Sequence, residues 1–359
     1  MHPEAIAALE ANPLVERVDL DVGGQGSLLV SVPLNRADVA HAEGYDGNGV
    51  TVAILDSGID ETHPDLQNAI VDEACFCRNG DGTGCCPGGS MQRFGPGSAA
   101  DDYGHGSNVA GIVASRGKVA GPGVAPGSRL VAVKVLDHQG KFSATAQIVS
   151  ALDWILGNHP DIRVINMSLG TNALFPGYCD ATASYTMVLA SAINSLRSRG
   201  TSTFVSTGND KSTTSMEAPA CVQAAISVGA VWKADVGAQN VTFFNCTDAT
   251  TTADEVTCFS NSNSTLDLLA PGAPITSDWL GGGRSTFFGT SQASPHCAGA
   301  AALLLQINPA LSVDAVEQIL KNSGRPVSDP RNGVIASRID AAAAVAAVPR
   351  AVRRRPARH

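Results

Sequence analysis

Short hydrophobic runs alternate with longer amphipathic stretches along most of the chain. The first run, 50–55, is apolar at nearly every position, which is typical of a central parallel strand buried on both faces. Alternation of such strands with helices predicts an α/β fold in three layers, a parallel sheet with helices on both faces. The other predicted strands are 130–135, 164–167, 203–206, 225–228 and 266–269, and the predicted helices are 107–115, 144–156, 184–199, 291–307 and 312–322.

Two segments interrupt this alternation. The first, at about 72–100, is rich in cysteine and glycine, and the second, at about 240–263, is rich in threonine, asparagine and aspartate. We predict that both are surface insertions. At the C-terminal end, residues 350–359 form a basic tail, which is typical of a frayed terminus.

Composition narrows the classes of partner. The chain has 359 residues, of which 24 are basic and 33 acidic, so its net charge is −9. An acidic balance argues against nucleic acid and anionic membranes as partners. The longest apolar run, Cys297 to Leu305, is about half of what a membrane span needs. We therefore expect a protein that acts without nucleic acid and without a membrane span.

The nine cysteines give information about the cellular compartment in which the protein acts. Four lie close together, as Cys75-x-Cys77 and Cys85-Cys86, in a pattern that does not match paired zinc knuckles. Disulfides, and hence an oxidising extracellular setting, explain them better than a metal does. Residues 1–20 lack the pattern of a signal peptide, so we expect that the chain begins downstream of one.

Three short motifs carry candidate chemistry. Asp56 follows the first predicted strand, at the edge of a parallel sheet where active residues collect. His105 lies between two glycines at the start of a predicted helix, and Ser291 lies at the start of another, with Pro295 placed in its first turn. Asp, His and Ser are the parts of a nucleophile activated by a general base, in which a carboxylate orients the imidazole. They predict acyl transfer through Ser291.

These motifs resemble those of subtilisin-like serine proteases, the subtilases. Asp56-Ser57-Gly58, Gly104-His105-Gly106 and Gly289-Thr290-Ser291 occur in the family's order, and the resemblance runs from about residue 35 to residue 347. It implies a subtilisin-like fold and a secreted serine endopeptidase that acts on polypeptides and needs no cofactor for its chemistry. It also implies a catalytic domain at 31–349, a remnant of an inhibitory prodomain or an N-terminal extension at 1–30, and a monomer.

The resemblance assigns further residues. Asn209 takes the place of the oxyanion-hole asparagine, and Asp65 matches one calcium ligand of the family, so a structural calcium ion is an open expectation. In three positions the chain departs from the family, with Ser107 and Asn108 after His105 and Gln292 after Ser291, which puts fine geometry in question. The residues expected to contact substrate are Ser168, Leu169, Gly170, Gly208 and Asp210.

Against this framework the cysteines can be sorted. Cys297, in the helix after Ser291, is expected to be buried and unpaired. We expect Cys246 to pair with Cys258 and Cys179 with Cys221, and the four clustered cysteines to form two bridges whose pairing is open.

Two other functions fit the same motifs. The chain could be a catalytically inactive subtilase fold that serves as a binding module, or a narrow-specificity processing protease or ligase. Retention of all three motifs and of Asn209 favours the active endopeptidase. The residue preference next to the cleaved bond stays open, although Asp210 could favour basic side chains.

Overall fold

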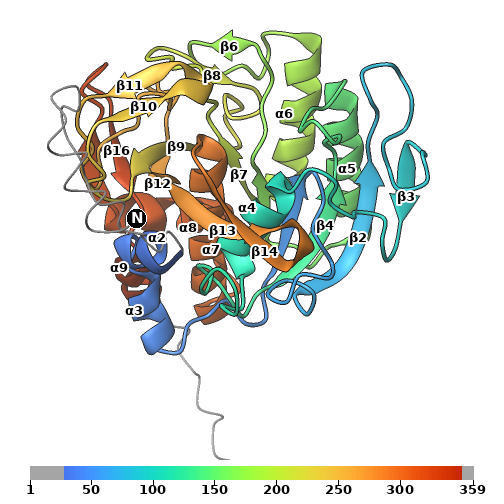
Figure 1. Ribbon diagram of the computed structural model, residues 1–359, viewed down its shortest axis with the longest axis horizontal. Helices are drawn as coiled ribbons and strands as arrows, with labels where there is room; N and C mark the ends of the chain where they lie inside the picture. The colour runs from blue at the N-terminus through green and yellow to red at the C-terminus, as the bar shows by residue number, and fades with distance from the viewer. Residues whose placement is uncertain (1–27, 350–359) are drawn as a thin grey trace, which may run out of the picture.

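A ten-stranded sheet organises the computed structural model, which describes residues 28–349 (Figure 1). Its strand order is β15-β16-β12-β9-β7-β5-β1-β4-β2-β3, parallel from β16 to β2 and antiparallel at both edges. The predicted α/β class is confirmed. The strands of this sheet are β1 (Thr51–Asp56), β2 (Ile70–Phe76), β3 (Gln92–Phe94), β4 (Arg129–Lys134), β5 (Val164–Met167), β7 (Ser202–Ser206), β9 (Ile226–Trp232), β12 (Leu268–Ala273), β15 (Arg325–Ser328) and β16 (Ile335–Arg338).

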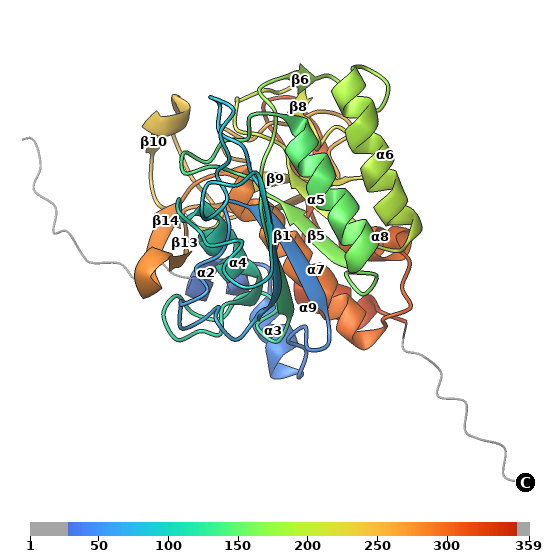
Figure 2. The same cartoon turned by 90° about the vertical axis from the view of Figure 1, so that its right-hand side faces the viewer.

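Helices cover both faces of this sheet. Figure 2 shows α5 and α6 side by side on one face, with α4 and α7 on the other. Alternate residues of β1 point to opposite faces, so Val52 and Ile54 pack beneath α4 and α7, whereas Ala53 and Leu55 pack beneath α5 and α6. The helices are α2 (Leu28–Leu34), α3 (Ala37–Ala42), α4 (His105–Ala114), α5 (Thr145–Asn158), α6 (Ser184–Ser198), α7 (Thr290–Ile307), α8 (Val313–Ser323) and α9 (Ala341–Ala347).

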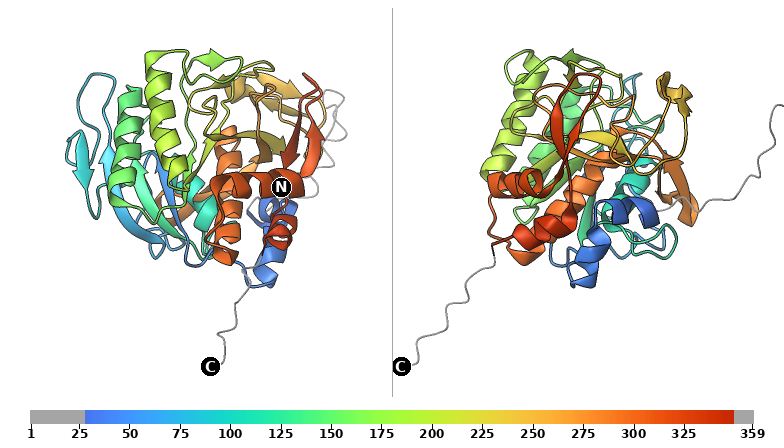
Figure 3. Two further views of the ribbon diagram at one scale, coloured as in Figure 1. Left: turned by 180° about the vertical axis from the view of Figure 1, so that it is seen from behind. Right: turned by 90° about the vertical axis from the view of Figure 1, so that its left-hand side faces the viewer.

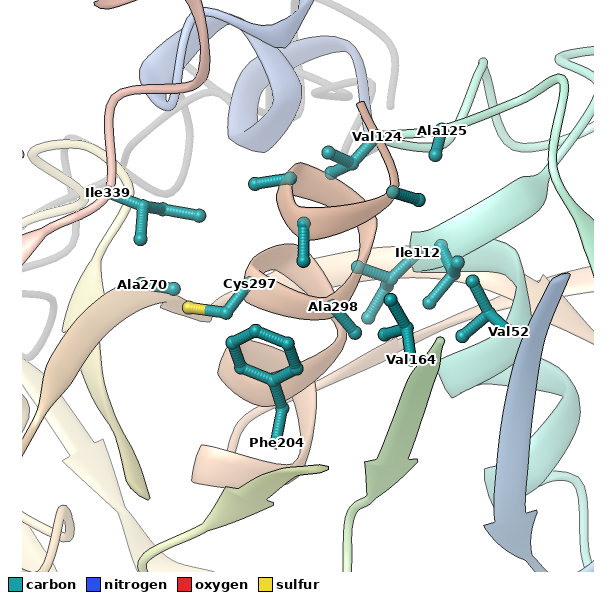
Figure 4. Close-up of a cluster of buried hydrophobic side chains, with 14 of the residues drawn as sticks. Val52, Ile112, Val124, Ala125, Val164, Phe204, Ala270, Cys297, Ala298 and Ile339 are labelled. Atoms are coloured by element: carbon teal, nitrogen blue, oxygen red, sulfur yellow. The ribbon is translucent and has the colours of Figure 1, made fainter. Parts of the chain in front are cut away.

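Helix α7 runs through the larger core (Figure 4). Small side chains let it approach its neighbours closely, and a Cβ added to Gly299 would lie 2.6 Å from the Cβ of Val124. Cys297 is fully buried here beside Phe204 and Ala270. Its thiol is free, as predicted.

Both termini of the described chain pack on the same side of this core. In the rear view α3 and α9 lie together (Figure 3). The boundary predicted at residue 30 falls inside α2, whose Val32 is buried in the core. The rest of the predicted prodomain remnant, residues 1–27, and the basic tail at 350–359 lie outside the described residues.

The first predicted insertion, at about 72–100, is partly wrong. Strand β2 pairs with β4 in the main sheet, and Cys75 is fully buried. Two adjacent acidic residues, Asp72 and Glu73, interrupt the hydrophobic pattern of this strand, so it was not recognised in the sequence. The two bridges left open by the sequence are Cys75–Cys86 and Cys77–Cys85.

The second predicted insertion, at about 240–263, is on the surface only in its first half. It begins with a hairpin of β10 (Gln239–Val241) and β11 (Cys246–Asp248), joined by the 3-10 helix η1 (Thr242–Phe244). Its second half, 256–263, is largely buried. The predicted pairs Cys246–Cys258 and Cys179–Cys221 are both present.

Three smaller elements lie around the carboxyl ends of the parallel strands. Two are antiparallel hairpins, formed by β6 (Leu174–Phe175) with β8 (Met216–Glu217) and by β13 (Ile275–Trp279) with β14 (Gly283–Phe287). The third is the 3-10 helix η2 (Leu280–Gly282), which connects β13 to β14. No helix within residues 28–349 combines the length and the hydropathy that a membrane crossing would require.

Candidate active site

Asp56 and His105 are brought together by close packing of β1 against α4. Asp56 ends β1, beside the point where the strand order changes direction between β1 and β5. His105 begins α4, and glycine on either side of it is required. Gly104 has a φ of +98°, and a Cβ added to Gly106 would lie 2.0 Å from the carbonyl oxygen of Gly58. The predicted role of these glycines in close backbone approach therefore agrees with the structure.

A carboxylate fixes the orientation of the imidazole ring. Asp56 is fully buried, and its Oδ1 accepts hydrogen bonds from Nδ1 of His105, at 2.7 Å, and from the backbone N–H of Ser57, at 2.8 Å. Because Nδ1 donates to Asp56, the unprotonated nitrogen is Nε2. Burial by itself would lower the pKa of His105, but the charge and the hydrogen bond of Asp56, with a contribution from Asp101, raise it above the ordinary value of 6.5.

Ser291 lies in the same cleft as His105, near the beginning of α7. Its Oγ donates a hydrogen bond to the carbonyl oxygen of Ser168 at 3.3 Å. Rotation about χ1 is the motion that would turn this hydroxyl toward His105. The cleft has a volume of about 210 Å³.

Pro295 lies in the second turn of α7 rather than in the first, which corrects the sequence prediction. Its missing N–H leaves the carbonyl oxygen of Ser291 without the usual helical donor. Ser168 fills this vacancy, because its Oγ donates to that oxygen at 2.7 Å. Pro295 thus allows a contact that ties Ser291 to the segment following β5.

Asn209 presents its amide nitrogen to the cleft. Its Oδ1 accepts hydrogen bonds from the backbone N–H of Thr290, at 2.9 Å, and from the Thr290 hydroxyl, at 3.1 Å. These two bonds fix the amide so that Nδ2 is free to donate, and Asn209 lines the cleft with Ser291. The arrangement can stabilise a negative oxygen that forms on a carbonyl attacked by Ser291.

The predicted substrate-contacting residues fall into two groups. Ser168, Leu169 and Gly170 follow β5 and line the cleft directly. Gly208 and Asp210 flank Asn209 in the segment after β7, and Asp210 is exposed. Neither Gly208 nor Asp210 is among the residues that line the cleft, although the backbone N–H of Gly208 donates to the hydroxyl of Thr290, next to Ser291, at 3.2 Å.

Two of the three departures from the family pattern, Asn108 and Gln292, bond to each other beside the site. Nε2 of Gln292 donates to Oδ1 of Asn108 at 3.4 Å, and Nδ2 of Asn108 donates to the backbone oxygens of Asp278 and Ser285. Ser107 donates to Asp101 at 2.7 Å. The bonds of Asn108 connect α4 to α7 and to the β13–β14 hairpin.

Sequence reasoning missed several residues around the cleft, and four of them illustrate why. Asp101 accepts hydrogen bonds from Ser57 and from the first turn of α4, and Asn261 holds the loop after β7. Phe243 and Phe244 of η1 add apolar surface to the cleft. The two adjacent phenylalanines in a polar loop were a usable signal, whereas Asp101 and Asn261 resemble ordinary loop residues in the sequence.

Asp65 belongs to a buried group with His63 and Asp278, whose ligand atoms lie within 4.8 Å of one another. The two carboxylate oxygens of Asp65 already accept the backbone N–H groups of Lys118 and Val119, at 2.6 and 2.8 Å. Calcium prefers six to eight oxygen ligands, so this group does not fit the calcium expectation. Burial and the charge of Asp65 raise the pKa of Asp278 to about 8, and a proton on Asp278 therefore offsets the negative charge at neutral pH.

Comparisons with known proteins identify the family to which the chain is similar. The model of the subtilase family matches residues 47–340. Subtilisin from Bacillus pumilus is 35% identical over 76% of this chain and 83% of its own length. Subtilisin E from Bacillus subtilis is 33% identical over 85% of this chain and 69% of its own length.

Solved structures give the same result. A crystal structure of a cold-adapted subtilisin-like serine proteinase matches with a TM-score of 0.61 and 28% identity, covering 81% of this chain and 89% of that one. A structure described as proteases from Pseudoalteromonas arctica matches with a TM-score of 0.68 and 28% identity, covering 89% and 94%.

Proposed function

This chain belongs to the subtilase family and is a serine endopeptidase, and we propose that it cleaves peptide bonds outside the cell through an acyl-enzyme on Ser291. The observation that carries the proposal is the placement of His105, Ser291 and Asn209 around one cleft, with Asp56 bonded to Nδ1 of His105. Four disulfides support the extracellular setting.

In the first step, Ser291 Oγ attacks the substrate carbonyl carbon while Nε2 of His105 takes its proton. Asp56 keeps the ring in the tautomer that can accept this proton and stabilises the imidazolium that results. The carbonyl oxygen becomes negative and accepts hydrogen bonds from Nδ2 of Asn209 and the backbone N–H of Ser291.

The first half of the reaction ends when the C–N bond breaks: the imidazolium of His105 gives its proton to the departing amine, and the acyl group stays on Ser291 as an ester. Water then attacks this ester with His105 again as the base, which releases the acid product and restores the serine. The segment 168–170 supports the substrate backbone beside this site. These steps use side-chain and backbone groups of the chain itself. The assignment of residues 1–30 to a remnant of an inhibitory prodomain or to an N-terminal extension stays a prediction.

Hydrolysis of denatured casein tests the proposal. The purified chain should release acid-soluble peptides, and a Ser291→Ala variant should release none above the background rate. The variant keeps the packing of α7, so its circular dichroism and melting temperature should match those of the parent. Binding of casein without cleavage by the parent chain would instead support the inactive binding module, and cleavage restricted to one peptide would support a processing enzyme.

A further inference from the structure

Glu217 places a carboxyl group against the wall of the cleft. It ends β8, and its backbone N–H donates to the carbonyl oxygen of Thr207 at 3.1 Å. A Cβ added to Gly170 would lie 1.8 Å from a carboxyl oxygen of Glu217, and one added to Gly208 would lie 2.6 Å from its Cδ. The carboxyl group therefore lies between the two glycine segments that follow β5 and β7.

These two segments flank the position of a substrate next to Ser291. Ser168 and Gly170 line the cleft from one side, and Asn209 lines it from the other. Because neither Gly170 nor Gly208 has a side chain, the carboxyl group of Glu217 can lie between them, with Nδ2 of Asn261 beside it at 2.5 Å from a Cβ added to Gly208. Glu217 as a whole residue is half-buried.

A second acid faces Glu217. Asp210 follows Asn209 directly, and its Oδ2 accepts a hydrogen bond from Nδ2 of Asn261 at 2.8 Å. Burial, followed by the hydrogen bond and charge of Asp210, raises the pKa of Glu217 to about 9. Two carboxyl groups thus share this space, and at neutral pH they hold a proton between them.

The described part of the chain, residues 28–349, forms no ion pair with these two acids. The nearest basic residue along the chain, Lys211, donates its Nζ to the carbonyl oxygen of Asn245. A positively charged group on a ligand could therefore pair with the carboxyl groups of Glu217 and Asp210.

We propose that Glu217, assisted by Asp210, makes the enzyme prefer substrates with lysine or arginine at P1, the residue whose carbonyl group Ser291 attacks. The aliphatic stem of such a side chain lies along the glycine backbone at 170 and 208, and its charged end reaches the carboxyl groups. An arginine fork can contact a carboxylate through two hydrogen bonds. This inference rests on the proposed function, because it requires that the cleft acylates Ser291.

The test compares substrates that differ only at P1. Matched peptide anilides with arginine, lysine, norleucine, phenylalanine or alanine at P1 are assayed at pH 8. Norleucine has nearly the shape of lysine without its charge, so the ratio of kcat/KM for lysine to that for norleucine measures recognition of the charge. We expect this ratio to be roughly ten to a hundred in the parent enzyme, in line with a hydrogen bond between charged groups.

Two substitutions test which carboxyl group recognises the positive charge at P1. Glu217→Gln should bring the ratio close to one while kcat/KM for the norleucine peptide changes little, and Asp210→Asn should lower the ratio by a smaller factor. Asp153→Asn removes the same charge from the exposed side of α5 and serves as the matched control, with an unchanged ratio. The norleucine rate also shows that each variant is folded.

The outcomes separate this inference from the proposed function. Faster cleavage of the norleucine, phenylalanine or alanine peptide than of the lysine and arginine peptides overturns the role of Glu217 but leaves the endopeptidase intact. A lysine preference that survives in Glu217→Gln likewise overturns it. Failure to cleave any of the five peptides or casein would contradict the proposed function itself.

Discussion

Asp56 and Glu217 each place a carboxyl group one contact away from the cleft, but their surroundings differ. Asp56 is enclosed in the core, and its Oδ1 accepts two N–H groups, one from His105 and one from Ser57. Glu217 is partly open to solvent and faces another acid, Asp210. The carboxyl group of Asp56 accepts N–H donors and therefore orients the base. The carboxyl group of Glu217 faces another acid instead, so in our proposal it is available to bind a substrate cation.

The comparison predicts that substitutions around Asp56 have the largest effects. Asp56→Asn should lower kcat by about ten-thousandfold, as the same change does in a serine protease triad, because an amide can stabilise the wrong tautomer of the histidine. Steady-state kinetics with one peptide anilide measures this. Glu217→Gln is the matched carboxyl-to-amide change, and with a norleucine substrate it should leave kcat within a few-fold of the parent. Similar losses of kcat in Asp56→Asn and Glu217→Gln would contradict the distinction between a carboxylate that orients the base and one that selects the substrate.

Removing the amide of Asn209 should have the next largest effect. Asn209→Ala should lower kcat by roughly a hundredfold to a thousandfold with little change in KM, the magnitude known for the corresponding asparagine of subtilisin, a relative of this chain. A peptide boronate, which imitates the tetrahedral intermediate, should lose affinity in parallel. A rise in KM at constant kcat would instead mean that Asn209 binds the ground state.

The pH dependence of kcat/KM should report the histidine bonded to Asp56. Because only the neutral ring of His105 can accept the proton of Ser291, activity rises with pH and is half-maximal above the ordinary pKa of 6.5. Below this inflection, kcat/KM should fall about tenfold per pH unit. Initial rates at low substrate concentration, between pH 5 and pH 9, give the profile. A maximum at acidic pH would rule out His105 as the base.

A smaller effect is expected from Asn261, which positions the loop carrying both Asn209 and Asp210. Its Oδ1 accepts the backbone N–H groups of Asp210 and Ser212, and its Nδ2 donates to the carbonyl oxygen of Thr207. Asn261→Ala should lower kcat by roughly tenfold, equivalent to about one net hydrogen bond.

The nearby Asn263→Ala is the control for Asn261. Asn263 is also buried and bonds to Phe175 and Thr265 rather than to the loop after β7. Its replacement should lower the melting temperature without lowering kcat or the affinity for the boronate. If kcat and boronate affinity fell equally in Asn261→Ala and Asn263→Ala, the role of Asn261 would be structural only.

The difference between the two regions also explains what could be predicted from the sequence. Asp56, His105 and Ser291 lie in short local motifs at the ends of hydrophobic strands or the starts of helices, so pattern and family resemblance both point to them. Asn261 and Glu217 act through contacts between segments far apart in the chain. Asn261 is buried by hydrogen bonds rather than by apolar neighbours, and hydrophobic patterns do not detect such burial.

Covalent labelling with an aryl sulfonyl fluoride is the most direct test of the central claim, that Ser291 is the nucleophile activated by His105 and Asp56. One label per chain should appear on the peptide that contains Ser291, and activity should fall in proportion to the label. Asp56→Asn should be labelled far more slowly, whereas Glu217→Gln should be labelled at nearly the parent rate. Loss of activity with the label on another serine would contradict the account.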